Sequence, residues 1–455
     1  MEVIGEDEFE DAVDGAWACI RSEAMQKLVV DLVNIPSRTG REGKAAEYLV
    51  SYMTSRGLDS ELMKISEDRA NAIGTLHGEG FGPRVLFNGH LDTSFTGEDE
   101  EDLPATGPLT DGFRPKAVVK GEWVHGLGAI NMKGGVAAYT EAACALKESE
   151  VILKGEVVAA AVAGEIEKTQ VKSLTKNYSG ELYEGAGFGM EYYLKHSKWP
   201  DYSITCEPTG MAVTRAKCGY VLIKLTTHGD LTYRPYSDED RIRNAIVSMS
   251  KVVGAIEREF SPEYTRRHTI DLGPDFGILK PRVNIGSIES GWPYKPGFVP
   301  AICCSYLDVR LVPGQTPQEA YLELETFLDD VEEIEELKVE QEIYGVKAPS
   351  LETPSNSKVV IACTNAFEYV SNAKHKPASP GRNSFGDDSL VTRKYGIPSV
   401  TWGPGGQLPE YAGAAAAAGG EGEFIRISDL LVACKMYIVA ALNICNRESI
   451  PATQK

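Results

Sequence analysis

The stretch VLFNGHLDTSFTG, residues 85–97, indicates both the fold and a candidate site. A short apolar run that ends at Asn88-Gly89 is typical of a buried strand. Side chains at positions i and i+2 of a strand point the same way, so His90 and Asp92 share a face at its carboxyl end. Ligands bind at that end of open α/β sheets, and a histidine ligand commonly has a carboxylate that orients its ring. The pattern therefore predicts half of a metal site, although the same residues also fit a surface turn with one histidine.

The composition is that of a globular protein with more than one domain. At 455 residues the chain exceeds the size at which a single core keeps growing. Its formal net charge of −20 argues against nucleic acid and anionic membranes as partners. We expect no membrane span, because uninterrupted apolar runs of about 18 residues are absent, and the acidic N-terminus lacks the apolar core of a signal peptide. The nine scattered cysteines form no CxxC pair, which is typical of buried thiols in the cytoplasm.

Strands and helices alternate along most of the chain. Residues 9–33 and 43–55 have helical patterns, and short strand-like segments follow them. This alternation predicts an α/β fold with a mixed sheet flanked by helices. Over residues 213–346 the order becomes β-α-β-β-α-β, which is the ferredoxin-like unit. We therefore predict a metal-binding domain formed by residues 1–212 and 347–455, with residues 213–346 inserted as a second, lid domain.

Residues that can bind a metal, a proton or an anion recur at the ends of later segments. GLGAINMKGG places Asn131 just before a helix, AVAGEIEK ends a strand with Glu165, and CEPT ends another strand with Glu207. DVRLVPG carries Arg310 on a strand of the predicted lid. Each motif alone is weak, but polar side chains at the carboxyl ends of neighbouring strands are what a shared site requires.

Taken in this order, several motifs resemble those of the M20 metallopeptidase family, which includes aminoacylases, deacetylases and carboxypeptidases. They are GHLD, GAINMKGG, GEIE, EPT, VNIGSI, LDVRLVPG and GIPSVTWGPGG. The resemblance covers nearly the whole chain and implies an α/β catalytic domain with a ferredoxin-like lid, in agreement with the pattern above. It also implies a site in which two zinc-like ions are bridged by a carboxylate and a water, and one glutamate takes the proton from that water.

Four residues match the family pattern position by position. The resemblance makes His90 and Glu207 ligands of the first metal, and it makes Asp92 the carboxylate that orients His90. It makes Glu165 the general base. The first metal position and the base are therefore both expected to be present in this chain.

The ligands of the second metal depart from the family pattern. Asn131 stands in place of the bridging aspartate, Ile166 in place of a glutamate ligand, and no histidine follows His375 to serve as the last ligand. Two close dications repel each other, and a neutral Asn131 bridges them poorly. We therefore expect a mononuclear site for Zn²⁺ or Mn²⁺ at the first position, with Asn131 as a third ligand. The stretch YAGAAAAAGGEGEF, residues 411–424, is either a flexible loop or a placeholder that hides the missing histidine.

Three residues are candidates for contacts with the substrate. Family lids often carry a GxxxH motif whose histidine reaches the active site of a partner subunit. Here GDLTY places Tyr233 at that position, where its hydroxyl can donate to an oxyanion or simply pack in the lid. Arg310 and Arg382 can clamp a substrate carboxylate, although Arg310 also fits a charge on the strand surface. Because the lid often builds dimers in this family, the resemblance implies a homodimer.

These residues predict a metal-dependent hydrolase that cleaves a C–N bond of a small substrate bearing a carboxylate. The metal and Glu165 activate a water, and Glu165 returns the proton to the leaving nitrogen. The default target is an amide, as in acyl-amino acids or dipeptides. The same machinery also fits an aromatic carbon that bears an amine, with release of ammonia, as in the M20 aminohydrolase that acts on 5-nitroanthranilate. A third interpretation is a non-catalytic pseudoenzyme that has lost its metal.

Overall fold

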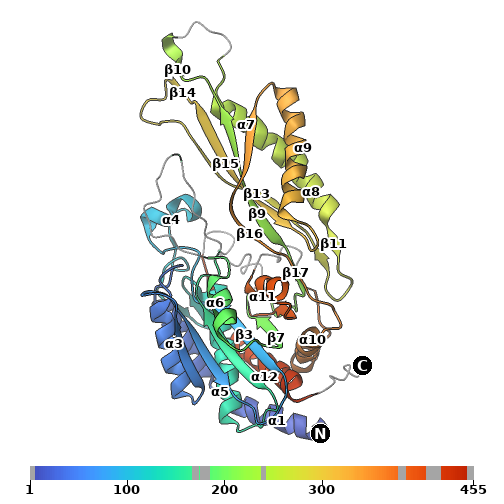
Figure 1. Cartoon of the computed structure of the whole chain (residues 1–455). Helices are drawn as coiled ribbons and strands as arrows, with labels where there is room; N and C mark the ends of the chain where they lie inside the picture. Colours follow the sequence, from blue (N-terminus) through green and yellow to red (C-terminus); the bar gives the residue numbers. More distant parts are fainter. Residues whose placement is uncertain are drawn as a thin grey trace.

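The structure, a computed structural model, describes residues 6–166, 174, 185–236, 242–377, 386–405 and 422–447. The chain forms two parts that lie at opposite ends of an elongated molecule (Figure 1). One part holds both termini and a central sheet covered by helices. The other part is a smaller sheet with helices on one side, and it is inserted in the middle of the chain.

The central sheet has six strands in the order β1-β2-β6-β3-β7-β18. Their bounds are β1 (Asp59–Lys64), β2 (Ala70–Leu76), β3 (Arg84–His90), β6 (Glu156–Val162), β7 (Tyr202–Thr205) and β18 (Ser399–Thr401). The four strands β6, β3, β7 and β18 are parallel to one another, whereas β2 runs antiparallel to both of its neighbours. The sheet is therefore mixed, as predicted. Both β2 and β3 are buried along their whole length, although each carries polar residues.

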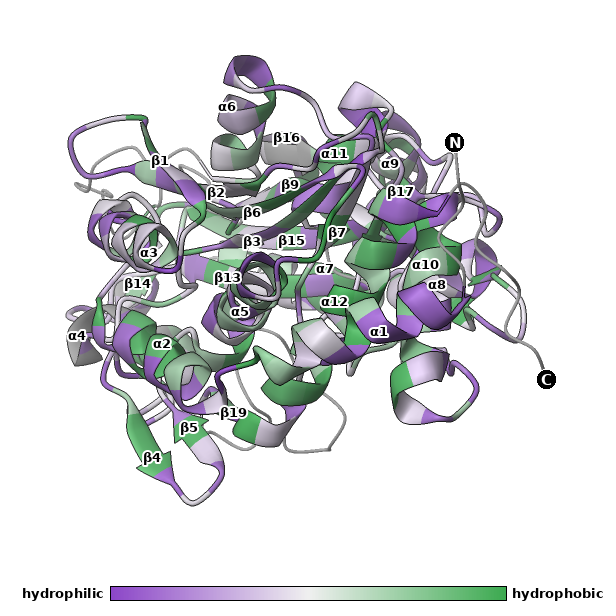
Figure 2. Ribbon diagram, turned by 90° about the horizontal axis from the view of Figure 1, so that it is seen from below, coloured by the Kyte–Doolittle hydropathy of each residue, from purple (hydrophilic) through white to green (hydrophobic). Residues whose placement is uncertain are grey.

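Helices cover both faces of this sheet (Figure 2). One face packs against α1 (Glu6–Ala18), α2 (Ser22–Asn34), α3 (Gly43–Ser55), α5 (Gly134–Glu148), α10 (Lys358–Ser371) and α12 (Ile427–Asn446). The other face packs against α6 (Phe188–His196) and α11 (Asp387–Tyr395). Helix α5 is buried over nearly all of its length, and its glycines and alanines let the neighbouring backbones approach closely. This packing fixes η1 (Ala129–Lys133), the single π-helical turn that leads into α5.

Helix α12 bears on the expectation that the chain has no membrane span. Among the described helices it is the one that is long and apolar enough, by length and composition alone, to cross a membrane. Within the protein, 72% of its apolar window is buried. It packs against α5 and α10 in the largest core, so its composition is explained by burial between two helices and the sheet.

The inserted part is a four-stranded antiparallel sheet in the order β13-β15-β9-β16. Its elements are β9 (Gly219–His228), α7 (Ala245–Ala255), α8 (Ser261–His268), β13 (Val283–Ser290), β15 (Ile302–Leu311), α9 (Pro317–Glu335) and β16 (Val339–Ala348). This is the β-α-β-β-α-β order of the predicted ferredoxin-like lid, with a separate hydrophobic core under α7 and α9. Helix α9 begins with a capping box, in which Thr316 and Glu319 cap each other's backbone amides.

The chain enters and leaves the lid through a short two-stranded ribbon. Strand β8 (Ala216–Lys217) pairs antiparallel with β17 (Leu351–Glu352). The lid sheet begins two residues after β8, with β9, and β16 ends three residues before β17. The predicted boundaries at residues 213 and 346 stay a prediction, and the ribbon is the element that connects the two parts.

Several short elements complete the chain. They are α4 (Asp99–Thr106), β4 (Val118–Lys120), β5 (Trp123–His125), β10 (Thr232–Tyr233), η2 (Arg234–Tyr236), η3 (Ile256–Phe260), β11 (Ile270–Asp271), β12 (Ile278–Leu279), β14 (Phe298–Val299) and β19 (Phe424–Arg426).

Two features of the helical pattern differ from the prediction. The helical stretch expected over residues 9–33 is two helices, α1 and α2, and the break after Ala18 lets both helices bury an apolar face. The sequence analysis also missed α4, α6 and α11. Helix α6 follows a glycine-rich segment, and its stability comes from burial of Met190 and Leu194 against the sheet, a tertiary effect that overrides local propensity.

Candidate metal centre

Three neighbouring parallel strands deliver the central side chains of the site to one edge of the sheet. His90 is the last residue of β3, Glu165 follows the end of β6, and Glu207 follows the end of β7. Because β6, β3 and β7 are adjacent and parallel, their carboxyl ends meet. Ligand atoms of the three residues lie within 4.8 Å of one another, and all three residues are buried. The strand ends therefore bring together one imidazole and two carboxylates.

The orientation of His90 turns a lone pair towards this cluster. Its Nδ1 lies 2.9 Å from the backbone oxygen of Asp92, so we place the ring proton on Nδ1, where it is donated to that oxygen. Nε2 then carries the lone pair, and it faces Asn131 Oδ1 at 3.2 Å and Glu165 Oε2 at 3.7 Å. Acceptor atoms from three residues thus converge in a buried space. This arrangement fits a divalent cation with a mixed nitrogen and oxygen shell.

Asp92 supports the site mainly through hydrogen bonds to the residues that follow β6. Its carboxylate lies 3.6 Å from His90 Nδ1, so its backbone oxygen is the nearer acceptor for the ring. The two carboxylate oxygens accept the backbone N–H groups of Glu165 and Ile166, each at 3.1 Å. The hydroxyl of Thr39 donates to the same group at 2.9 Å. Asp92 therefore fixes the turn that presents Glu165, a role that the sequence pattern did not indicate.

Asn131 reaches the cluster from η1, and its backbone is held by a residue that sequence analysis did not single out. The Asn131 N–H donates to Glu423 Oε2 at 3.0 Å, and both residues are buried. The amides of Gly128 and Ile130 also donate to Glu423. Burial raises the pKa of Glu423, while these amides and the nearby ammonium of Lys133 oppose the rise. Glu423 lies at the end of the alanine-rich stretch, and apart from its charge no feature of the sequence identified it as a residue of the site.

Glu207 is also held from behind, by a buried lysine that the sequence analysis missed. Lys217 Nζ lies 3.3 Å from Glu207 Oε2 and 3.3 Å from Asp388 Oδ1. Burial alone would lower the pKa of Lys217, but the neighbouring carboxylates, first that of Asp388, outweigh burial and raise it. The ammonium thus neutralises charge beside the cluster and restrains one oxygen of Glu207.

The acidic pair that follows Gly386 lies next to this lysine at the start of α11. Asp388 accepts a hydrogen bond from the Thr401 hydroxyl in addition to its contact with Lys217. Asp387 is fully buried, and among the residues that the structure describes its two oxygens have no hydrogen-bond partner. Burial, with the neighbouring carboxylate of Glu207 adding to it, raises the pKa of Asp387 well above its ordinary value. Asp388 is therefore part of the network behind Glu207.

Two of the candidate substrate residues lie on the lid, and the third lies outside the described residues. Arg310 lies on β15 of the lid and donates to Asp308 at 2.5 Å, with its guanidinium 5.3 Å from the ring centre of Tyr220. Tyr233 lies on β10 and packs against Phe298, with ring centres 5.3 Å apart. Arg382 and residues 406–421, which include most of the alanine-rich stretch, lie outside the described residues.

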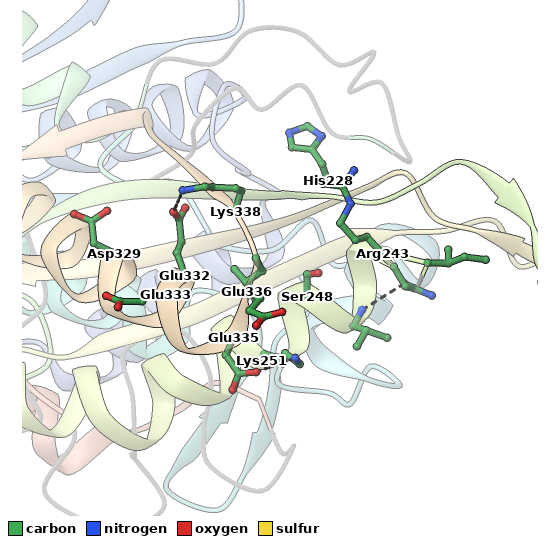
Figure 3. Close-up of a pocket in the computed structure, with 14 residues that line it drawn as sticks. His228, Arg243, Ser248, Lys251, Asp329, Glu332, Glu333, Glu335, Glu336 and Lys338 are labelled. Carbon is green, nitrogen blue, oxygen red and sulfur yellow. Dashed lines mark hydrogen bonds and ion pairs between the residues drawn. The ribbon is translucent and has the colours of Figure 1, made fainter. Parts of the chain in front are cut away.

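A pocket of about 650 Å³ lies elsewhere, on the helical side of the lid (Figure 3). It lies between α7 and α9. The basic side chains that line it are paired with acids: Arg243 with Asp230, Lys251 with Glu335, Lys338 with Glu332 and His228 with Glu340. The pocket therefore presents no unpaired positive charge to an anionic ligand among the residues described, and it is separate from the cluster at the strand ends.

Comparisons with known proteins agree with this arrangement. The family model described as "Peptidase family M20/M25/M40" matches residues 86–443. A probable succinyl-diaminopimelate desuccinylase of Staphylococcus aureus is 25% identical over 257 residues, which is 56% of this chain. The match spans 57% of that relative, so the chain spans little more than half the length of the curated proteins it resembles.

Solved structures show the same fold over almost the whole chain. The di-peptidase Dug1p of Saccharomyces cerevisiae superposes with a TM-score of 0.69 at 12% identity, covering 96% of this chain and 99% of Dug1p. The YXEP protein of Bacillus subtilis, described as a dinuclear metal-binding peptidase, gives a TM-score of 0.59 at 13% identity, with 94% and 99% covered. At these identities the likeness establishes the α/β domain with its inserted lid.

Proposed function

The chain belongs to peptidase family M20/M25/M40, a family of hydrolases, and from that premise we propose that it is a metal-dependent hydrolase of a C–N bond. The observation that carries the proposal is the buried convergence of His90, Glu165 and Glu207 at the ends of three parallel strands. Such a cluster of acceptor atoms is costly to bury unless a cation is bound there.

We assign His90, Glu207 and Asn131 as the residues that hold one divalent ion, Zn²⁺ or Mn²⁺. A bound ion of this kind supplies Lewis acidity, which polarises a carbonyl group and acidifies water. Glu165 is the general base. Its backbone N–H is fixed by Asp92, and its Oε2 lies 3.7 Å from His90 Nε2, so the carboxylate borders the space where the attacking water must be. Glu165 then passes the proton to the leaving nitrogen.

A single ion is favoured by the side chains on the second side of the site. Ile166 offers no lone pair, and Asn131 is neutral, so neither compensates the repulsion between two close dications. Metal analysis tests this point. We expect about one equivalent of Zn²⁺ or Mn²⁺ per chain after incubation with excess metal and removal of the unbound ion. Two equivalents would contradict the mononuclear site, and less than half an equivalent would contradict the metal-dependent enzyme.

The names of two relatives support a proposal for the substrate class. One is named as a desuccinylase and another as a di-peptidase, and both names describe cleavage of an amide. We therefore propose an acyl-amino acid or a dipeptide-like molecule with a free carboxylate as the substrate. Arg310 and Arg382 remain the proposed contacts for that carboxylate. Arg310 donates to Asp308 through Nε and Nη2, so the proposed contact with the substrate would be made beside this ion pair.

The decisive experiment combines a substrate screen with one variant. Wild-type protein loaded with metal is assayed against acyl-amino acids, dipeptides and aromatic amines. We expect turnover of an amide, and Glu165→Gln should abolish that turnover while the metal content stays the same. Retained turnover in Glu165→Gln would contradict the assignment of the base. Turnover of only an aromatic amine, with release of ammonia, would replace the amide with the aminohydrolase reaction.

We also propose a homodimer that forms through the lid. Strand β13 is an edge strand of the lid sheet, and apolar residues there and on α7 are exposed: Ile288 by 52%, Val247 by 51% and Ile246 by 42%. Strand β10, which carries Tyr233, lies at the outer end of the lid (Figure 1), and this position supports the proposal that Tyr233 serves a site of another subunit. Light scattering of wild type and Ile288→Lys tests this, and a monomeric wild type would contradict it. A cytoplasmic location remains a prediction.

A further inference from the structure

We infer that Glu423 is a positioning residue that holds Asn131 where a metal ion can use it, an inference that rests on the proposed single-ion site. Glu423 is 1% exposed and lies immediately before β19, close to the C-terminal end of the described chain. Its Oε2 accepts the Asn131 N–H at 3.0 Å, across 292 positions of sequence. The amides of Gly128 and Ile130 donate to the same carboxylate.

The segment that carries Asn131 needs such a partner. Gly128 has a φ of +84°, and the backbone angles of Asn131 and Met132 in η1 are not helical. The amides of Gly128, Ile130 and Asn131 therefore precede the regular helix α5, which begins at Gly134 and supplies no acceptor for them. Glu423 thus satisfies three buried donors that would otherwise be unpaired, each of which is costly.

Glu423 is itself fixed in place by its backbone. Its N–H donates to Gly112 O at 2.9 Å, and its carbonyl oxygen accepts the Gly126 N–H at 3.0 Å. The next residues form β19, which pairs with β5 just before Gly126. The carboxylate is therefore a rigid link between the C-terminal segment and the Asn131 turn, and it sets the 3.2 Å approach of Asn131 Oδ1 to His90 Nε2.

This geometry gives Glu423 a function that goes beyond packing. A ligand must be held within about 0.5 Å of the productive geometry, and a turn without its anchoring acceptor loses that precision. Residues that support metal ligands typically contribute about 10–100-fold to metal affinity. We therefore expect Glu423 to control how tightly the ion is held, through the position of Asn131 and without touching the ion.

The test compares Glu423→Gln with a matched control, Glu141→Gln. Glu141 is also a fully buried glutamate, on α5, but it pairs with Arg56 at 2.8 Å and does not contact the cluster. Mn²⁺ affinity is measured by competition with a chromogenic chelator. Backbone amide exchange of residues 126–134 is measured by mass spectrometry on protein freed of metal. Because Glu423 acts through Asn131, Glu423→Gln should weaken Mn²⁺ binding by about tenfold, the lower end of that range, and speed exchange in 126–134. Glu141→Gln should change neither, whatever its effect on thermal stability.

An unchanged Mn²⁺ affinity, within twofold of wild type, or unchanged exchange in 126–134 would overturn the inference. If Glu423→Gln does not fold, Glu423→Asp replaces it as the test variant, because it keeps the negative charge but has a shorter side chain. Glu423→Asp should still lose affinity and protection, and wild-type values for both would overturn the inference. If the wild type binds no Mn²⁺ or Zn²⁺, the proposed function fails, and exchange in 126–134 still shows whether Glu423 holds the turn.

Discussion

The two sides of the metal centre differ in their metal-binding side chains. On one side, His90 and Glu207 are donors, and each is restrained by a buried partner, the Asp92 backbone oxygen and the Lys217 ammonium. On the other side, Asn131 is neutral and Ile166 offers no donor, yet their backbone amides are held by the carboxylates of Glu423 and Asp92. Backbone hydrogen bonds support both sides, whereas, among the described residues, charged or imidazole ligands are present on only one. Backbone support and ligand identity are therefore separable.

The largest effect is expected from breaking the support of the first side. Lys217→Met leaves the carboxylates of Glu207 and Asp388 buried without their cation, so we expect a loss of about 3–5 kcal/mol in stability of the metal-free protein. Urea denaturation in the presence of a chelator measures it. Lys217→Arg keeps the charge and should lose less than half as much. A loss below about 1 kcal/mol in Lys217→Met would show that this side does not depend on the ion pair.

Removal of a donor should separate the two sides in metal affinity. We expect His90→Ala to weaken binding of Zn²⁺ or Mn²⁺ by at least about 100-fold, equivalent to about 2.7 kcal/mol, because it removes the imidazole of the cluster that the described residues form. Asn131→Ala should lose about tenfold, since a neutral amide oxygen is the weaker donor. Isothermal titration of both variants tests the ranking. Equal losses of metal affinity in the two variants would contradict the proposed difference between the two sides.

A negative charge can be introduced on the second side by a substitution at position 131. Asn131→Asp restores an anionic ligand beside His90 without a change in size, so the ion should bind about tenfold more tightly, or by about 1.4 kcal/mol. The same titration measures the change, and the metal content per chain should stay near one while Ile166 is present. A second equivalent of metal in Asn131→Asp would show that the charge at position 131 alone limits the site to one ion.

The smallest effect is expected at Ile166. Its side chain supplies no donor, and its backbone N–H remains bonded to Asp92 whatever the side chain is. We therefore expect Ile166→Ala to change the metal affinity by less than about twofold, or 0.4 kcal/mol. A tenfold loss would mean that the packing of Ile166 positions Glu165, and the contrast between the two sides would be weaker than proposed.

The sequence predicted the fold because its signals are local. The apolar run before His90 is a strand that ends at His90, and the sequence around Thr316 forms a capping box that begins the lid helix. The α/β sheet and ferredoxin-like lid follow from the order of such segments. Helices α6 and α11 were missed because they are stabilised by contacts with a sheet whose strands are distant in sequence.

The supports of the site were missed for a related reason. Lys217 lies in a β-rich stretch, and its partner Asp388 is 171 positions away, so no local pattern marks the pair. Glu423 follows an alanine-rich segment that has no strand or helix period. The donors at the strand ends were accessible to sequence reasoning because strand ends are places where ligands bind. The groups that hold those donors depend on tertiary structure alone.

The position of Lys217 has a mechanical consequence. Lys217 is the second residue of β8, and β8 with β17 forms the ribbon through which the chain passes to and from the lid. The ammonium that restrains Glu207 is therefore carried by the ribbon that connects the two parts. A rotation of the lid about this ribbon would displace Lys217 and, through their ion pair, the Glu207 carboxylate. Such a rotation would change how tightly the ion is held, with no contact between the lid and the ion itself.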